Sequence, residues 1–334
     1  MKKGLFLLAT AALMFASCEN DLKVDENQAL VNGNQKEIAF TTLTRKAKRA
    51  AIDGTTFPTT LDMMVTAYQV EATGGSAGVY FDATPFAKDG DYWKGTPAKY
   101  WPLTPCYINF LAIANANADN NTGVTWGTNK ADQVVIVMAD NSSAQRDLMY
   151  ARGDGEVTQS GNALSFPTKV DMEFKHAQAW IDFKVKAKTD AETAITVNSI
   201  TLTGAKYNGT YTVTHTNYNA KASQSVAGAW SALGDAQNIA VPGWSATALT
   251  TDFVTVGNGL LVVPDDAVAG DFTSFTISYT YDSKDYTYTY TPASTNVDQA
   301  KHYIYEITFQ LHEILINPTV EDWADQSATE LTVQ

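Results

Sequence analysis

Cysteine, histidine and charged residues are all scarce in this sequence. Of 334 residues, two are cysteine, four are histidine and 18% are charged. Two cysteines cannot form the disulfide framework that holds many small secreted domains together. The histidines are scattered, and no two of them have metal-ligand spacing on one element: His176, His215, His302 and His312. We therefore expect no disulfide scaffold, no metal site and no cofactor.

Basic residues are also in short supply. The chain holds 23 Lys+Arg against 36 Asp+Glu, a formal net charge of −13. Nucleic-acid binding requires a basic footprint, so that class of partner is excluded. No nucleophile elbow or phosphate-binding loop occurs, and no nucleophile–base pair can be named, so we expect no enzyme. Paired carboxylates for sugar hydrolysis meet only in three dimensions and stay open as a weaker alternative.

Long apolar runs are missing except at the very start. Lys2 and Lys3 precede an apolar run from Leu5 to Phe15, which is shorter than the ~20 residues that span a bilayer. Small residues then lead into Cys18. This pattern predicts a lipoprotein signal over residues 1–17, with an acyl chain such as palmitate on Cys18; an ordinary secretory signal is the alternative. Cys106 would then lack an intrachain partner, and its apolar neighbours predict a buried, inert thiol.

Strand-forming residues are abundant, with 16 tyrosines and many Thr, Val and Phe. Short apolar or alternating runs recur between turn residues, and no helical periodicity is sustained. The sequence therefore predicts an all-β fold of two tandem β-sandwich domains, over residues 50–170 and 171–334, with the seam between residues 165 and 178. The polar residues 19–34 predict a flexible tether before the fold.

Local patterns give more detailed expectations. In AWIDFKVKA (179–187) the alternation predicts one buried face, with Trp180 and Asp182 on a wet face. Asn208-Gly209 predicts a hairpin turn. A second hairpin is predicted at residues 272–292, with its turn at Asp282 to Asp285 and with Tyr and Thr alternating on its arms. A short helix near residues 142–151 is the one helical candidate.

A dense basic patch interrupts this acidic chain in TRKAKRAAIDGTTFP (44–58). It follows KEIAFTTL, where Ile38 and Phe40 alternate with smaller residues as in a short strand. An accessible basic segment suits an Arg-specific protease. Cleavage after Arg49, or after the rival site Arg45, would release a propeptide of residues 18–49 that contains the lipid, the tether and the strand at about residues 36–43.

Loss of a strand exposes an apolar edge that another copy of the chain can fill by donor-strand complementation. The C-terminal segment EILINPTVEDWADQSATELTVQ (313–334) is the candidate donor. Its apolar residues form two alternating rows: Ile314, Ile316 and Val320, then Leu331 and Val333. A head-to-tail contact of this kind does not close on itself and builds a filament. The same strands could instead pair within one chain.

Four features together resemble the fimbrillin family, the pilin subunits of type V pili in anaerobic Gram-negative bacteria. They are the lipoprotein signal, the arginine site followed by AAIDGTTFP, the YWPLTPCYINFLA segment and the closing NPTVEDW. The resemblance implies a pair of transthyretin-like β-sandwich domains, export as a lipoprotein to the outer-membrane surface, removal of the N-terminal segment by an Arg-specific protease, and polymerisation by strand exchange. Its implied role is adhesion to a host or bacterial surface receptor.

One further hypothesis uses the same export signal but no polymerisation. A surface lipoprotein could bind glycans by stacking exposed aromatic side chains on sugar rings. The candidate side chains are Trp93, Trp101, Trp126 and Trp244. Core packing is the competing interpretation for most of them, because sandwich cores use tryptophan routinely.

Overall fold

The structure is a computed structural model, and it describes residues 35–43, 57, 61–71, 78–115, 124–126, 133–216, 225–265, 270–310 and 313–322. Its regular structure in these ranges is 22 β-strands and one short 3-10 helix, η1 (Asp190–Ala194). The prediction of an all-β fold is therefore confirmed. Within the same ranges, no helix is long and apolar enough to cross a membrane.

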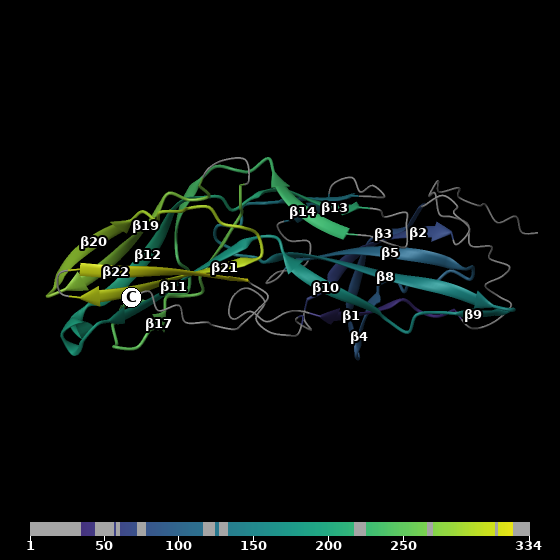
Figure 1. Ribbon diagram of the computed structural model, residues 1–334, viewed down its shortest axis with the longest axis horizontal. Helices are drawn as coiled ribbons and strands as arrows, with labels where there is room; N and C mark the ends of the chain where they lie inside the picture. Colours follow the sequence, from purple (N-terminus) through teal and green to yellow (C-terminus); the bar gives the residue numbers. More distant parts are fainter. Residues whose placement is uncertain are drawn as a thin grey trace, which may run out of the picture. The chain divides into compact units, whose positions relative to one another are not determined.

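The largest sheet contains eight strands, in the order β10-β1-β4-β3-β2-β5-β8-β9. Their bounds are β1 Ala39–Leu43, β2 Met63–Glu71, β3 Gly78–Asp89, β4 Tyr92–Gly95, β5 Cys106–Asn115, β8 Leu148–Ser160, β9 Ala163–Ser165 and β10 Val170–His176. Strand β10 also pairs with β8, at Glu173↔Arg152 through His176↔Met149. This extra pairing closes the sheet into a ring of strands, in which β1 links β10 to β4 (Figure 1).

A four-stranded sheet, in the order β14-β13-β7-β6, combines segments that are far apart in the sequence. Its strands are β6 Val124–Trp126, β7 Gln133–Met138, β13 Gly209–Thr216 and β14 Ser225–Ser231. Strand β13 runs antiparallel to β7, with Tyr211 opposite Ile136. The two predicted segments 50–170 and 171–334 therefore share a sheet, and their division into separate domains stays a prediction.

Two further sheets pack face to face in the second half of the chain. One contains β11 Ala179–Ala187, β17 Val254–Thr255, β18 Leu260–Val262, β21 Lys301–Gln310 and β22 Glu313–Asp322. The other contains β12 Thr196–Ala205, β15 Gln237–Ala240, β16 Thr247–Ala248, β19 Ser274–Tyr281 and β20 Lys284–Tyr290. Figure 1 shows β12, β19 and β20 in one layer and β11, β21 and β22 in the other.

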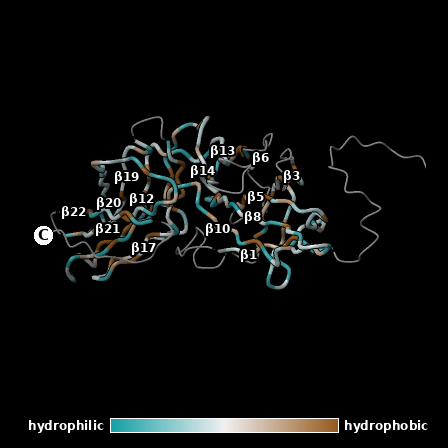
Figure 2. The backbone as a smooth tube through the Cα atoms, turned by 45° about the vertical axis from the view of Figure 1, so that its right-hand side comes forward, coloured by the Kyte–Doolittle hydropathy of each residue, from teal (hydrophilic) through white to brown (hydrophobic). Residues whose placement is uncertain are grey.

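The apolar side chains gather in three clusters. The first lies inside the ring of strands and includes Phe40, Phe86 and Phe110. The second fills the space between the two later sheets. The third lies between strands β5 and β8 and the four-stranded sheet, and includes Leu111, Tyr150 and Tyr211. In Figure 2 the hydrophobic, brown stretches follow these strands.

Strand β10 shows how the sequence selects a face. In VDMEFKH (170–176) the residues Val170, Met172 and Phe174 are buried, and the intervening Asp171, Glu173 and Lys175 are exposed. This period of two is the signature of a strand with one face on a core. On the neighbouring β8, a Cβ at Gly155 would lie 2.3 Å from the Trp101 ring, so only glycine leaves room for that buried indole.

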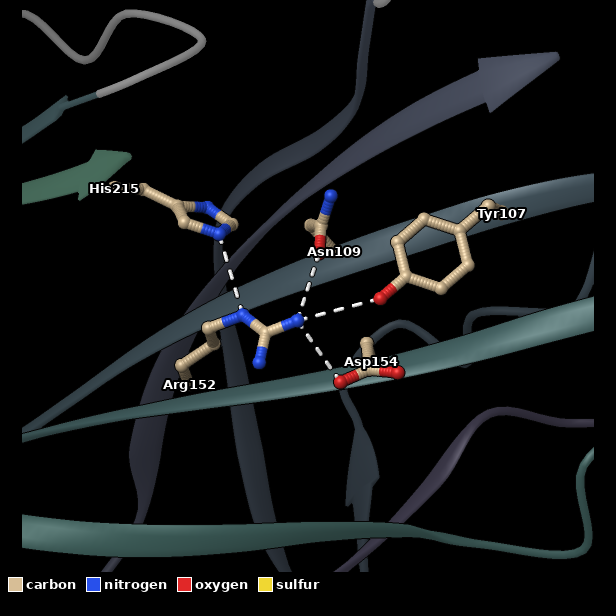
Figure 3. Close-up of polar contacts among 5 residues, drawn as sticks. All are labelled: Tyr107, Asn109, Arg152, Asp154 and His215. Carbon is tan, nitrogen blue, oxygen red and sulfur yellow. Dashed lines mark hydrogen bonds and ion pairs between the residues drawn. The ribbon is translucent and has the colours of Figure 1, made fainter. Parts of the chain in front are cut away.

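A polar cluster ties the ring of strands to β13 (Figure 3). The Nε of Arg152 donates to His215 Nε2 at 3.2 Å. Its Nη2 lies 2.9 Å from Asp154 Oδ1 and 3.3 Å from Tyr107 Oη, and it also reaches Asn109 Oδ1 at 3.4 Å. Because Asn109 and His215 are buried, this cluster satisfies polar groups between the two layers.

The predicted hairpin at Asn208-Gly209 is wrong. Strand β12 before it pairs with β15, β16 and β19, whereas β13 after it pairs with β7 and β14. The connection passes from one sheet to another. Gly209 lies close to the segment after β14, since a Cβ on it would lie 2.6 Å from Leu233 Cδ2 and 3.1 Å from the Ser231 carbonyl oxygen. The Asn-Gly pair therefore marks a close contact and not a two-residue turn.

The predicted helix near residues 142–151 is also wrong, because strand β8 begins at Leu148 and a loop precedes it. The amide of Asn141 replaces helical hydrogen bonds: its Nδ2 donates to Arg146 O and its Oδ1 accepts from Arg146 N, both at 2.8 Å. The Asp147 carboxylate binds His176 Nδ1 at 2.9 Å. Short polar side chains that bond the backbone in this way compete with helix formation.

The prediction that one face of β11 is exposed to solvent is wrong for the first two residues of that face. Trp180 and Asp182 are buried, because β11 is an inner strand between β21 and the pair β17 and β18. The Trp180 ring stacks on His302 of β21 at a centroid distance of 3.8 Å. The hairpin predicted at residues 272–292 is confirmed, with Tyr279 opposite Tyr286 and left-handed backbone at Asp282 and Ser283.

Candidate functional site

Strand β1 contains Phe40 of the predicted removable strand, Ile38 lies directly before it, and β1 has a neighbour on each side. It pairs parallel with β10, with Phe40 opposite Val170, and antiparallel with β4, with Phe40 opposite Trp93. The residues just before it are paired too, since Ile38 N donates to Lys99 O at 2.8 Å. Trp101 N likewise donates to Lys36 O at 2.9 Å, so the segment 36–43 is hydrogen-bonded to its neighbours along its length.

The side chains of Ile38 and Phe40 are fully buried, at 0% exposure. The Phe40 ring meets Phe86 edge-on at 4.8 Å and Phe110 edge-on at 5.0 Å between centroids. Edge-to-face aromatic pairs add stability beyond the apolar area that they bury, by ~0.5–1.5 kcal/mol each. Removal of β1 would expose these rings and would leave β4 and β10 without their shared neighbour.

Exposed polar groups also bind β1 to β10. The Thr41 hydroxyl donates to the Asp171 carboxylate, and Lys169 Nζ lies 2.8 Å from Asp171 Oδ1. The hydrogen bonds from Lys169 and then from Thr41 hold the pKa of the Asp171 carboxyl below its usual value. Because the carboxylate is about half exposed, at 52%, its contribution to stability is small.

Phe57 anchors the chain after the basic patch. Its side chain is fully buried, 4.6 Å from Phe174 and 5.5 Å from Trp93 between ring centroids. Residues 44–56, with Arg45 and Arg49, lie outside the described residues but between two anchored positions, β1 and Phe57. Cleavage in this interval would break the covalent link between β1 and Phe57 and leave Phe57 in place.

Strand β22 contains Ile314, Ile316 and Val320 of the candidate donor, and it forms the end of its sheet. It pairs in the same chain with β21 along its whole length, from Gln310↔Glu313 to Lys301↔Asp322. Ile314 and Ile316 are partly buried against the second apolar cluster, whereas Val320 is 54% exposed. Leu331 and Val333, the second predicted row, lie outside the described residues.

Two polar side-chain contacts hold the last residues of β22. His302 Nδ1 lies 2.9 Å from Glu321 Oε1, and Lys301 Nζ bonds the Asp322 carboxylate. The hydrogen bond to Asp322 raises the pKa of the Lys301 ammonium above its usual value. The sequence analysis did not predict these side-chain contacts, because they depend on the antiparallel register of β21 and β22.

The tryptophan and cysteine expectations have mixed outcomes. Trp93 and Trp101 are buried, at 2% and 1% exposure, so they do not offer rings to a sugar. Trp244 is partly buried and donates from Nε1 to Val197 O at 3.0 Å. The side chain of Trp126 and the whole of Cys18 lie outside the described residues. Cys106 is buried as predicted, and burial raises the pKa of its thiol to about 12.

The fold has relatives among solved structures. The chain is similar to a fimbrial protein from Bacteroides vulgatus, with 16% identity, a TM-score of 0.52 and coverage of 87% of this chain and 100% of that chain. It is also similar to a proposed cell adhesion protein from Bacteroides uniformis, with 16% identity, a TM-score of 0.49 and coverage of 86% and 98%. At these identities the likeness to the first structure shows a common fold.

A comparison with curated proteins finds no match. A family model described as fimbrillin-like matches residues 48–323, which is most of the chain. This match begins inside the basic patch and includes all of β22. The chain belongs to the fimbrillin-like family, as the sequence motifs indicated.

Proposed function

We propose that this chain is a structural pilin subunit of a surface fimbria that serves cell adhesion. Its precursor would be lipidated on Cys18 and held at the outer membrane, and an Arg-specific protease would cut after Arg49 or Arg45. The processed subunit would then bind the donor segment 313–334 of a neighbour in the position that β1 leaves. The observation that supports this best is the burial of Ile38 and Phe40 between two paired strands.

The cut by itself breaks no contact of β1. It turns a strand within the chain into a separate segment, so its effective concentration falls from the intramolecular range to that of free peptide. Release then exposes Phe86 and Phe110 and two strand edges, which a second apolar strand can cover. Strand β22 suits this role because it has one neighbour and is partly exposed.

The first experiment removes the proposed cleavage sites. In the Arg45→Ala/Arg49→Ala variant, mass spectrometry should find a full-length lipidated chain, and negative-stain microscopy should find no filaments. The matched control is Lys46→Ala/Lys48→Ala, which removes two cations from the same patch and keeps both arginines. Filaments from the arginine variant, at the level of the control, would refute processing as the trigger.

The second experiment locks β1 in place after cleavage. Ala39 of β1 lies opposite Lys94 of β4, so Ala39→Cys/Lys94→Cys places two thiols within reach of a disulfide. We expect the oxidised variant to be cut without assembling, and assembly to return on reduction. Assembly of the oxidised and cut variant would show that β1 need not leave. Deletion of residues 313–334 should stop elongation while the first apolar cluster stays folded.

A further inference from the structure

The outward face of the sheet β15-β12-β19-β20 is a regular array of hydroxyl groups. We call this set the hydroxyl face: Ser199, Thr201 and Thr203 of β12, Ser274, Thr276, Ser278 and Thr280 of β19, and Thr287 and Thr289 of β20. They align in rungs, because Thr201 lies opposite Thr276 and Thr276 lies opposite Thr289. A second rung joins Ser199, Ser278 and Thr287.

The opposite face of the same strands forms the core. Val197, Ile200 and Leu202 of β12 and Phe275 and Ile277 of β19 are buried in the second apolar cluster. The hydroxyl residues between them are intermediate or exposed, and both Thr287 and Thr289 are exposed. Figure 1 shows this layer with β11, β21 and β22 on its other side. The hydroxyl face therefore points away from the sandwich.

The hydroxyl face is nearly free of charge in a chain with a net charge of −13. Among the outward positions of these strands, the charged residue is Asp285, at the end of β20, where it accepts a hydrogen bond from Thr280 Oγ1 at 2.6 Å. On β15 the outward residues Asn238 and Ala240 are neutral. Two copies that approach through this face avoid most of the like-charge repulsion between acidic surfaces.

Aromatic rings are absent from the outward positions of β12, β19 and β20. Four tyrosines of β19 and β20 alternate with the threonines and pack inward against the second apolar cluster: Tyr279, Tyr281, Tyr288 and Tyr290. Tyr286 is 41% exposed, and it lies on the side of Tyr279, its partner across the hairpin, away from the hydroxyl face. Stacking on sugar rings is therefore not available on this face, which makes a glycan a poor occupant.

We propose that the hydroxyl face is a self-association surface, whose partner is the same face of a second copy of this chain. A hydroxyl group both donates and accepts hydrogen bonds, so a face of hydroxyls is complementary to itself. That property is what a two-fold interface requires, since both partners then present the same surface. The bond between Thr276 Oγ1 and Thr289 Oγ1, at 3.0 Å, shows such pairing already within one sheet.

The interface is small. Four strands about 4.8 Å apart, each contributing roughly six residues at about 3.4 Å, give an area of roughly 400 Å² per copy. A standard stable interface buries about 800 Å² per partner, so one pair of faces binds weakly. If the proposed function holds, a filament repeats the face many times, and multivalency would then join filaments side by side.

The experiment uses unprocessed monomer, so it does not depend on strand exchange. The protein is the chain from residue 18 onward with Cys18→Ser, which carries no lipid, studied by sedimentation equilibrium up to millimolar concentration. We expect a weak monomer–dimer equilibrium. Thr287→Lys/Thr289→Lys should weaken it at least about tenfold, because charges would be forced together in the interface.

The matched control is Thr214→Lys/Thr216→Lys, two exposed threonines at the same spacing on β13 of a different sheet. It should leave the dimer constant within about twofold, and circular dichroism should show both variants folded. A mixture of the Lys variant with Thr287→Glu/Thr289→Glu should restore association as a heterodimer, since opposite charges then meet. A monomeric wild type, an equal loss in the control, or no restoration in the mixture would each overturn the proposal.

Discussion

Strand β1 has a hydrogen-bonded neighbour on each side, whereas β22 has one neighbour and ends its sheet. The side chains of Phe40 in β1 and of Ile38 directly before it are fully buried. Those of β22 range from the partly buried Ile316 to Val320, which is 54% exposed. An inner strand stabilises the fold and cannot be lost without cost, while an edge strand can change partners with less disruption. The two strands therefore suit opposite roles in assembly.

The largest expected difference between the two strands is in the free energy of unfolding that is lost when an apolar side chain is removed. Phe40→Ala should lower the free energy of unfolding by about 3–5 kcal/mol, because it leaves a cavity beside Phe86 and Phe110. Val320→Ala on β22 should change it by no more than about 0.5 kcal/mol, as for other exposed positions. Urea titration of both variants measures this. Equal losses would remove the distinction between the two strands.

An intermediate effect is expected at the inner row of β22. Ile316→Ala should cost about 1–2 kcal/mol, because its side chain is only partly buried against the second apolar cluster. Leu315→Ala is the matched neighbour, since Leu315 is 38% exposed, and it should cost less. If Ile316→Ala proved as costly as Phe40→Ala, β22 would be as firmly fixed as β1.

A smaller effect is expected at the end of β22. Glu321→Gln removes the charged partner of His302 Nδ1 and should cost roughly 1 kcal/mol, with faster amide exchange at the end of the strand. Glu306→Gln is the control, because Glu306 and Lys184 are 3.6 Å apart and each is 33% exposed. Its expected cost is below about 0.5 kcal/mol. A larger loss of stability in the control than in Glu321→Gln would argue against a specific contribution from the contact between Glu321 and His302.

The smallest effect is expected at the polar contact between Thr41 of β1 and Asp171 of β10, and it depends on pH. The pKa of Asp171 is lowered in the folded state by Lys169 and Thr41, so its carboxylate stabilises the fold above its unfolded pKa of about 3.9. This contribution is lost as the pH falls through the lower folded pKa. Asp171→Asn should therefore cost less than about 1 kcal/mol at pH 7 and less still at pH 2. Urea titrations at the two pH values test this, and a cost at pH 2 as large as the cost at pH 7 would contradict it.

Alternating patterns in the sequence predicted the strands well. The Tyr-Thr hairpin of β19 and β20 and the strand that contains Phe40 follow from alternation, which fixes the face of each side chain locally. The burial of Cys106 follows from its apolar neighbours. These features depend on residues close together in the sequence, and local chemistry decides them.

The wrong predictions have a common cause, because the strands and side chains that contact these residues come from distant segments of the sequence. Asn208-Gly209 looks like a turn, but Leu233 packs against Gly209 and the two flanking strands join different sheets. Trp180 and Asp182 look exposed, but β21 places His302 against Trp180. No local pattern contains this information, because a strand's periodicity does not say what covers its second face.

The sequence by itself determined that the chain is all-β, where its apolar strands lie and which family it belongs to. Only the tertiary structure decided that β1 closes a ring of strands, that β22 ends a sheet, and that nine hydroxyl residues align on one face. The physical reason is that alternation sets which side of a strand is apolar, while neighbours and register are set by hydrogen bonds between segments far apart in the chain.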